Sequence, residues 1–162
     1  MKDPVFPVPS SLIEQACSFS DYDCGKVFEL GGGVVVKTGK LNHPNGACGY
    51  RIEFDGKVIA ICTDTEHYEG EIDANVVQLA QEADIMVYDS AYTDEEYPKF
   101  KGWGHSTWQE AIKVADKAQV KQTLLFHHDP SHNDDKMDQI AKEAAAVRDG
   151  VRPAIEGEEI SL

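Results

Sequence analysis

Residues 50–64 read YRIEFDGKVIAICTD, and this stretch decides how the chain folds. Residues 50–54 alternate apolar and polar side chains, which is typical of a strand with one buried face. The dipeptide Asp55-Gly56 lies between two strand patterns and predicts a hairpin turn. Residues 58–62 are apolar on both faces, which favours a strand in the middle of a sheet. Asp64 follows that strand.

The chain before this hairpin also has the pattern of strands. Residues 27–30 and 34–41 predict two strands separated by a run of three glycines, and the second is rich in β-branched valine. Residues 1–25 are expected to be an irregular lead-in, because three prolines near the start prevent a helix there. A short helix is plausible only over residues 11–16.

After the hairpin, strand and helix patterns alternate. Apolar spacing predicts helices over 72–83, 107–118 and 134–148, with Asp73 and Thr107 as N-caps. Between them, residues 85–88 and 123–126 predict buried strands. The sequence therefore predicts an α/β domain (α+β in some schemes) over residues 26–162, with a mixed sheet flanked by helices.

Potential ligands and acid–base groups follow the predicted strands. His43, Asp64, Asp89 and His127 each come just after a strand, and His105 precedes a helix. Strand ends can direct such side chains into one crevice, and imidazole with carboxylate suits zinc, iron or manganese. Each residue also has a plainer interpretation, as a turn histidine or a capping aspartate. Spacing alone leaves both interpretations open.

The charge of the chain bears on its partners. Its 29 acidic residues against 15 Lys and Arg give a formal charge of −14. Such a surface repels a polyphosphate, so the charge predicts no nucleic-acid partner. A small anionic substrate remains compatible, because bound cations can invert the local field. No signal peptide or membrane-spanning stretch is evident, so we expect a cytoplasmic protein without a membrane partner.

Four motifs in order carry a family resemblance. They are LNHP before GYRIE (residues 41–53), ICTDT (61–65), GHST (104–107) and LFHHDP (125–130). Together they resemble the metallo-β-lactamase-fold hydrolases, in particular the phosphodiesterase branch that includes ribonuclease Z-like and cyclic-nucleotide-phosphodiesterase-like enzymes. The resemblance covers about residues 26–145.

The resemblance implies a role for each matched residue. His43, Asp64 and His127 would be metal ligands, with Asp64 bridging two divalent ions. Zinc is the expected metal, with manganese or iron as alternatives. His105 would donate a proton or stabilise phosphoryl charge, and Asp89 would orient it. The implied reaction is hydrolysis of a phosphodiester bond in a small substrate such as a cyclic nucleotide.

One departure from the family pattern matters. The family's first ligand segment, H-x-H-x-D-H, is absent from this sequence, whose first histidine is His43. We therefore expect the C-terminal half of the family's αββα sandwich, with a missing N-terminal half or a second copy of the chain covering its open face. Alone, the chain is expected to bind metal weakly or not at all and to be inactive.

Other functions remain open from the sequence. The chain could be a non-catalytic, partner-binding module with a relic site, or a thioester or lactone hydrolase. The GHST motif with Asp89 favours phosphodiesters, whereas the net charge argues against a tRNA-processing nuclease. His67, His128 and His132 match no motif.

Overall fold

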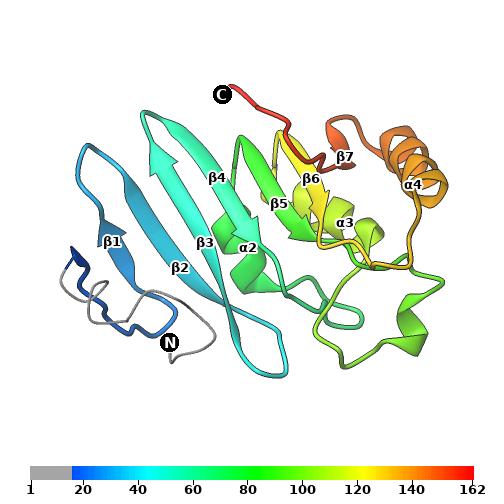
Figure 1. Ribbon diagram of the computed structural model, residues 1–162, viewed down its shortest axis with the longest axis horizontal. Coiled ribbons are helices and arrows are strands. Elements are labelled where there is room, and N and C mark those ends of the chain that lie inside the picture. The colour runs from blue at the N-terminus through cyan, green and yellow to red at the C-terminus, as the bar shows by residue number, and fades with distance from the viewer. Residues whose placement is uncertain (1–15) are drawn as a thin grey trace.

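A single mixed sheet organises the molecule (Figure 1). The computed structural model describes residues 16–162. The seven strands follow one another across the sheet in sequence order: β1 (Val27–Glu29), β2 (Val35–Leu41), β3 (Ala47–Phe54), β4 (Lys57–Cys62), β5 (Ile85–Asp89), β6 (Gln122–Phe126) and β7 (Val151–Pro153). The helices that lie wholly within these residues are α2 (Ala74–Ala80), the 3-10 helix η1 (Tyr97–Lys99), α3 (Trp108–Ala118) and α4 (Asp134–Val147).

The direction of the strands determines where their ends meet. Strands β1 to β4 pair antiparallel, and β4 to β7 pair parallel. Strands β2, β4, β5 and β6 therefore run in the same direction, and their carboxyl ends lie at one edge of the sheet. The strand that is apolar on both faces, β4, is central, as its sequence predicts.

The helices pack on the sheet, and α2 and α3 begin at the N-cap residues that the sequence predicts. Figure 1 shows α2 and α3 behind the sheet, and α4 contacts α3 and β7. The Asp73 side chain accepts hydrogen bonds at the start of α2, and Thr107 accepts one from the Glu110 amide at the start of α3. The predicted α/β fold class is confirmed. None of the helices described between residues 16 and 162 is long and apolar enough to cross a bilayer.

The structure differs from the sequence prediction at the start of β3. This strand begins at Ala47 rather than Tyr50, because Ala47 to Gly49 pair with the end of β2. Glycine at position 49 allows Leu79 of α2 to pack closely on the strand, since a Cβ atom there would lie 2.8 Å from Leu79 Cδ1. Residues 1–15 of the predicted lead-in, and nearly all of the predicted helix over 11–16, lie outside the described residues.

Asp84, just before β5, connects the chain at Val58 of β4 with Lys121 before β6. Its carboxylate accepts hydrogen bonds from Lys121 Nζ at 2.7 Å and from the Val58 amide at 2.8 Å. These bonds hold the pKa of Asp84 below its ordinary value of 3.8, and the bond from Lys121 has the largest effect. Its contribution to stability is therefore present above that value and is lost as the pH falls through the folded-state pKa.

We predict that Asp84→Asn lowers the free energy of unfolding by about 1–2 kcal/mol at neutral pH. The difference from the wild type should shrink in acid, because the wild-type carboxyl is then protonated. Urea denaturation of both proteins at neutral pH and near pH 3 measures this. A difference that stays constant over this range would contradict the assigned role.

Candidate metal centre

The side chains predicted to form a site come from one edge of the sheet. Asp64 lies two residues beyond β4, Asp89 is the last residue of β5, and His127 directly follows β6. His43 lies in the turn after β2, and His105 lies in the loop before α3. Because these strands run in the same direction, their ends deliver four of the side chains to the same region, and the loop before α3 adds His105.

Asp64, His105 and His127 form a compact cluster. Each offers one ligand atom, and the three atoms lie within 4.8 Å of one another. His127 Nε2 is 3.8 Å from Asp64 Oδ1, and the rings of His105 and His127 stack with centroids 4.6 Å apart. One carboxylate and two imidazoles form a donor set that suits zinc, manganese or iron. The residues present therefore fit a divalent ion.

Two residues of the cluster have an unusual backbone conformation. Asp64 has φ 56° and His127 has φ 64°, both in the left-handed region. A residue other than glycine in this region is destabilised by roughly 1–2 kcal/mol. Such conformations persist where the surrounding structure holds them, and they gather at functional sites. The adjacent His128 is not among the residues with a positive φ.

Asp89 and His105 form a buried pair beside the cluster. Asp89 is fully buried, and one of its oxygens is 2.8 Å from His105 Nδ1. Its carboxylate also accepts hydrogen bonds from three backbone amides, those of Thr65, Ala91 and Ser106, each at 3.2 Å. The bond to Asp89 raises the pKa of His105, and partial burial opposes this increase. The pair fixes the ring and leaves Nε2 free of this bond.

His43 lies beside the cluster and is not one of its three residues. Its ring centroid is 6.0 Å from that of His105. The Asn45 amide donates to His43 Nδ1 at 3.3 Å, which leaves Nε2 without this contact. Gly104 lies so close that an added Cβ atom would be 2.2 Å from His43 Cδ2. His43, Asp64 and His127 were the ligands implied by the resemblance, whereas the tight group of three contains His105 in place of His43.

Glu66, which was not predicted from the sequence, has a buried carboxylate bonded to the loop that carries His105. It accepts hydrogen bonds from the Tyr97 hydroxyl and from the amides of Gly102 and Gly104. Burial acts to raise the pKa of Glu66, but these hydrogen bonds outweigh it, and the pKa is lowered. The only signal in the sequence was its place two residues after Asp64.

The three unassigned histidines lie around the site in different ways. His67 Nδ1 is 2.9 Å from the Ser106 hydroxyl, and its ring packs on Tyr97. His132 Nε2 is 3.2 Å from Glu96 Oε1. Both ring nitrogens of His128 are buried without a hydrogen-bond partner in the described structure, and burial lowers its pKa. His128 is therefore suited to remain a neutral packing residue.

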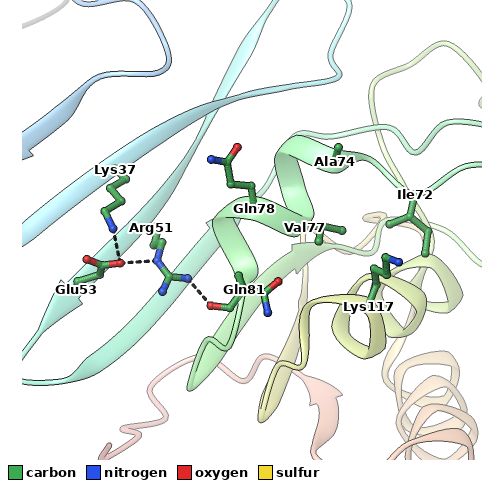
Figure 2. A pocket seen from close by; sticks show the side chains of 9 residues that line it. All are labelled: Lys37, Arg51, Glu53, Ile72, Ala74, Val77, Gln78, Gln81 and Lys117. Carbon is green, nitrogen blue, oxygen red and sulfur yellow. Dashed lines mark hydrogen bonds and ion pairs between the residues drawn. The ribbon is translucent and has the colours of Figure 1, made fainter.

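One hollow in the described structure lies away from these residues. Figure 2 shows this pocket of about 590 Å³ between the sheet and helices α2 and α3. Arg51 there donates to Glu53 Oε1 at 2.6 Å and to the carbonyls of Leu79 and Gln81 at 3.0 and 2.6 Å. The Arg51 guanidinium thus satisfies carbonyl groups at the end of α2 and connects this helix to β3. A smaller hollow of about 340 Å³ is lined by His43 and Glu66, among others.

Comparison with known proteins identifies related sequences. A family model described as the beta-lactamase superfamily domain matches residues 6–128. Ribonuclease Z of Gemmatimonas aurantiaca is 35% identical over 107 residues, which are 66% of this chain and 32% of that protein. Ribonuclease Z of Enterococcus faecalis is 28% identical over 167 aligned positions, covering 90% of this chain and 52% of that protein. The chain thus spans about a third to a half of the length of these curated relatives.

Solved structures share the fold. The metallo-beta-lactamase fold protein YhfI from Bacillus subtilis superimposes with a TM-score of 0.69 at 20% identity, over 85% of this chain and 52% of that one. Human tRNase Z, short form, gives a TM-score of 0.62 at 24% identity, over 83% of this chain and 44% of that one. At these identities the likeness concerns the fold alone.

These relatives overturn one prediction made from the sequence. The net charge led to the expectation of no nucleic-acid partner, but the relatives are named as ribonucleases, and one structural neighbour is named as a tRNase. The expectation is therefore wrong. Its physical weakness is that net charge averages over the whole surface, whereas histidines and bound cations determine the sign of the field at a site.

Proposed function

The chain belongs to the beta-lactamase superfamily, and on that premise we propose that its cluster of Asp64, His105 and His127 serves a metal-dependent hydrolase that cleaves phosphodiester bonds. The observation that carries the proposal is the meeting of three ligand atoms within 4.8 Å at the carboxyl ends of the strands. Zinc is the preferred ion, with manganese or iron as alternatives, because the donors are imidazole nitrogen and carboxylate oxygen.

Each side chain has a proposed task. Asp64, His43 and His127 would hold the divalent ions. Bound ions would polarise the phosphoryl group and lower the pKa of a water molecule. His105, held at Nδ1 by Asp89 at 2.8 Å, presents Nε2 to the leaving-group oxygen and donates its proton there. His105 can instead complete the metal site, since it lies within the tight group of three.

The number of ligands limits what this chain does by itself. A site for two ions requires more donors than the three that meet here, and the sequence contains no H-x-H-x-D-H segment. We propose that the chain alone binds divalent ions weakly and hydrolyses substrate slowly. Mass spectrometry under native conditions tests this, and two tightly held ions per chain would contradict it.

Two substrate classes share the same chemistry. The names of the relatives favour a phosphodiester bond in RNA. A small phosphodiester such as a cyclic nucleotide contains the same kind of bond and is the second class. The hollow beside His43 has a volume of about 340 Å³, which suits a small ligand or one nucleotide of a longer chain. RNA with a 3′ extension and a cyclic nucleotide are the substrates to compare.

The proposal is tested by assaying bis(p-nitrophenyl) phosphate, a cyclic nucleotide and a tRNA with a 3′ extension in excess Mn²⁺ or Zn²⁺. Slow, metal-dependent hydrolysis of at least one phosphodiester is expected, and His105→Ala should reduce it by about 100-fold or more. A thioester and a lactone serve as comparison substrates. Hydrolysis of these without any phosphodiester cleavage would refute the proposal and favour the rival hydrolase class.

A further inference from the structure

Glu66 is connected to the loop that carries His105. Glu66 is buried, with only 8% of the residue exposed to solvent. Glu66 Oε1 accepts hydrogen bonds from the Tyr97 hydroxyl and the Gly102 amide, both at 2.7 Å, and Oε2 accepts one from the Gly104 amide at 2.9 Å. Charge-assisted bonds of this kind are stronger than neutral ones. They fix the backbone on both sides of Trp103 and up to the residue before His105.

The backbone of Glu66 is connected to the loop that carries His43. The Glu66 amide donates to the Asn42 carbonyl at 2.8 Å. In return, the Asn42 side-chain amide donates to the Glu66 carbonyl at 2.9 Å. Asn42 immediately precedes His43, so this reciprocal pair determines where the turn after β2 lies relative to Glu66.

Glu66 therefore joins three loops that each carry one site residue. Asp64 lies two residues before it in its own loop, and the hydrogen bonds reach the loops of His43 and His105. The tolerance for movement between these loops is small, because a Cβ atom added to Gly104 would lie 2.2 Å from His43. A rigid junction is needed to hold ligands in a productive arrangement.

We propose that Glu66 is a positioning residue, a buried junction that sets the relative placement of His43, Asp64 and His105. Both of its carboxylate oxygens accept hydrogen bonds from the 97–104 loop, so the role assigned to Glu66 is to hold that loop, although the residue also lines the hollow beside His43. The assignment of a metal and a substrate to those three residues rests on the proposed function, whereas the junction itself rests on the hydrogen bonds alone.

The variant Glu66→Gln tests this role with little change in shape. Its amide nitrogen is a donor and cannot accept the bonds that one carboxylate oxygen accepts now. We expect the amide NMR signals of Gly102 and Gly104 and the imidazole signals of His43 and His105 to shift. Affinity for Mn²⁺ should fall by about 10- to 100-fold, as when residues that support metal ligands are replaced.

Glu69→Gln is the matched control. Glu69 lies in the same loop, and its side chain is 69% exposed and pairs with Lys101 at 2.7 Å. This variant should leave the same signals and the Mn²⁺ affinity unchanged. Should Glu66→Gln fail to fold, Tyr97→Phe removes one donor to the junction, and it should shift the same four signals by a smaller amount.

The outcomes separate the two proposals. The positioning role is refuted if the four signals and the Mn²⁺ affinity of Glu66→Gln match those of Glu69→Gln. If Glu66→Gln does not fold, the role is refuted when Tyr97→Phe leaves the four signals unshifted. If the signals shift while the wild type shows no Mn²⁺ binding, the junction stands and the proposed function fails.

Discussion

Replacing Asp89 with alanine is expected to lower the free energy of unfolding by about 3–5 kcal/mol, which is a large fraction of the stability of a small domain. Asp89 is fully buried at the end of β5. Its removal leaves three amide groups without their acceptor in the interior, and it leaves His105 Nδ1 without a partner. A buried donor without an acceptor destabilises the folded state by about 1–3 kcal/mol.

Urea denaturation followed by circular dichroism measures the effect of Asp89→Ala. Asp116→Ala is a suitable control, because the Asp116 side chain is 66% exposed and pairs with Arg148 at the surface. An exposed pair of this kind contributes about 0–1 kcal/mol. If the two variants were equally stable, the network around Asp89 would not have the importance assigned to it.

Replacing Gly104 with alanine is expected to displace His43. Gly104 has φ 93°, a conformation that destabilises a non-glycine residue by about 1–3 kcal/mol. The new Cβ atom would lie 2.2 Å from His43 Cδ2, 2.7 Å from His43 Nε2 and 2.8 Å from Pro44 Cδ. Overpacking adds about 1–3 kcal/mol to the loss of stability. The imidazole NMR signals of His43 and thermal unfolding report the two effects.

Gly102→Ala separates strain from displacement. Gly102 has a similar φ of 87°, but a Cβ atom added there would have no neighbouring atom within 4 Å. This variant should show the loss due to backbone strain alone and leave the His43 signals in place. Equal perturbation of His43 in both variants would argue against the direct contact between Gly104 and His43.

Much of the fold follows from local patterns. The Asp55-Gly56 turn, the doubly apolar β4 and the alternation of strand and helix after it were predicted, because each depends on residues close in sequence. The early start of β3 was not predicted. Gly49 interrupts the apolar pattern, and the reason for a glycine there is its packing against Leu79 of α2, which is distant in the sequence.

The site was predictable in outline and not in detail. His43, Asp64, Asp89 and His127 each follow a predicted strand, which suggested a common crevice, although spacing alone left their plainer interpretations open. The exchange of His43 for His105 in the tightest group depends on the geometry of loops, which no periodicity encodes. Glu66 was missed for the same reason, since its three hydrogen-bond donors lie more than thirty residues away along the chain.

The central claim is that a divalent cation binds at the place where Asp64, His105 and His127 meet. Titration with Mn²⁺, followed by the imidazole NMR signals, tests it most directly, because a paramagnetic ion broadens nearby signals even when it binds weakly. We predict that His105 and His127 broaden first, before His128 and His132, and that Asp64→Asn abolishes this order. Broadening that is uniform over the histidines, or unaffected by Asp64→Asn, would contradict the claim.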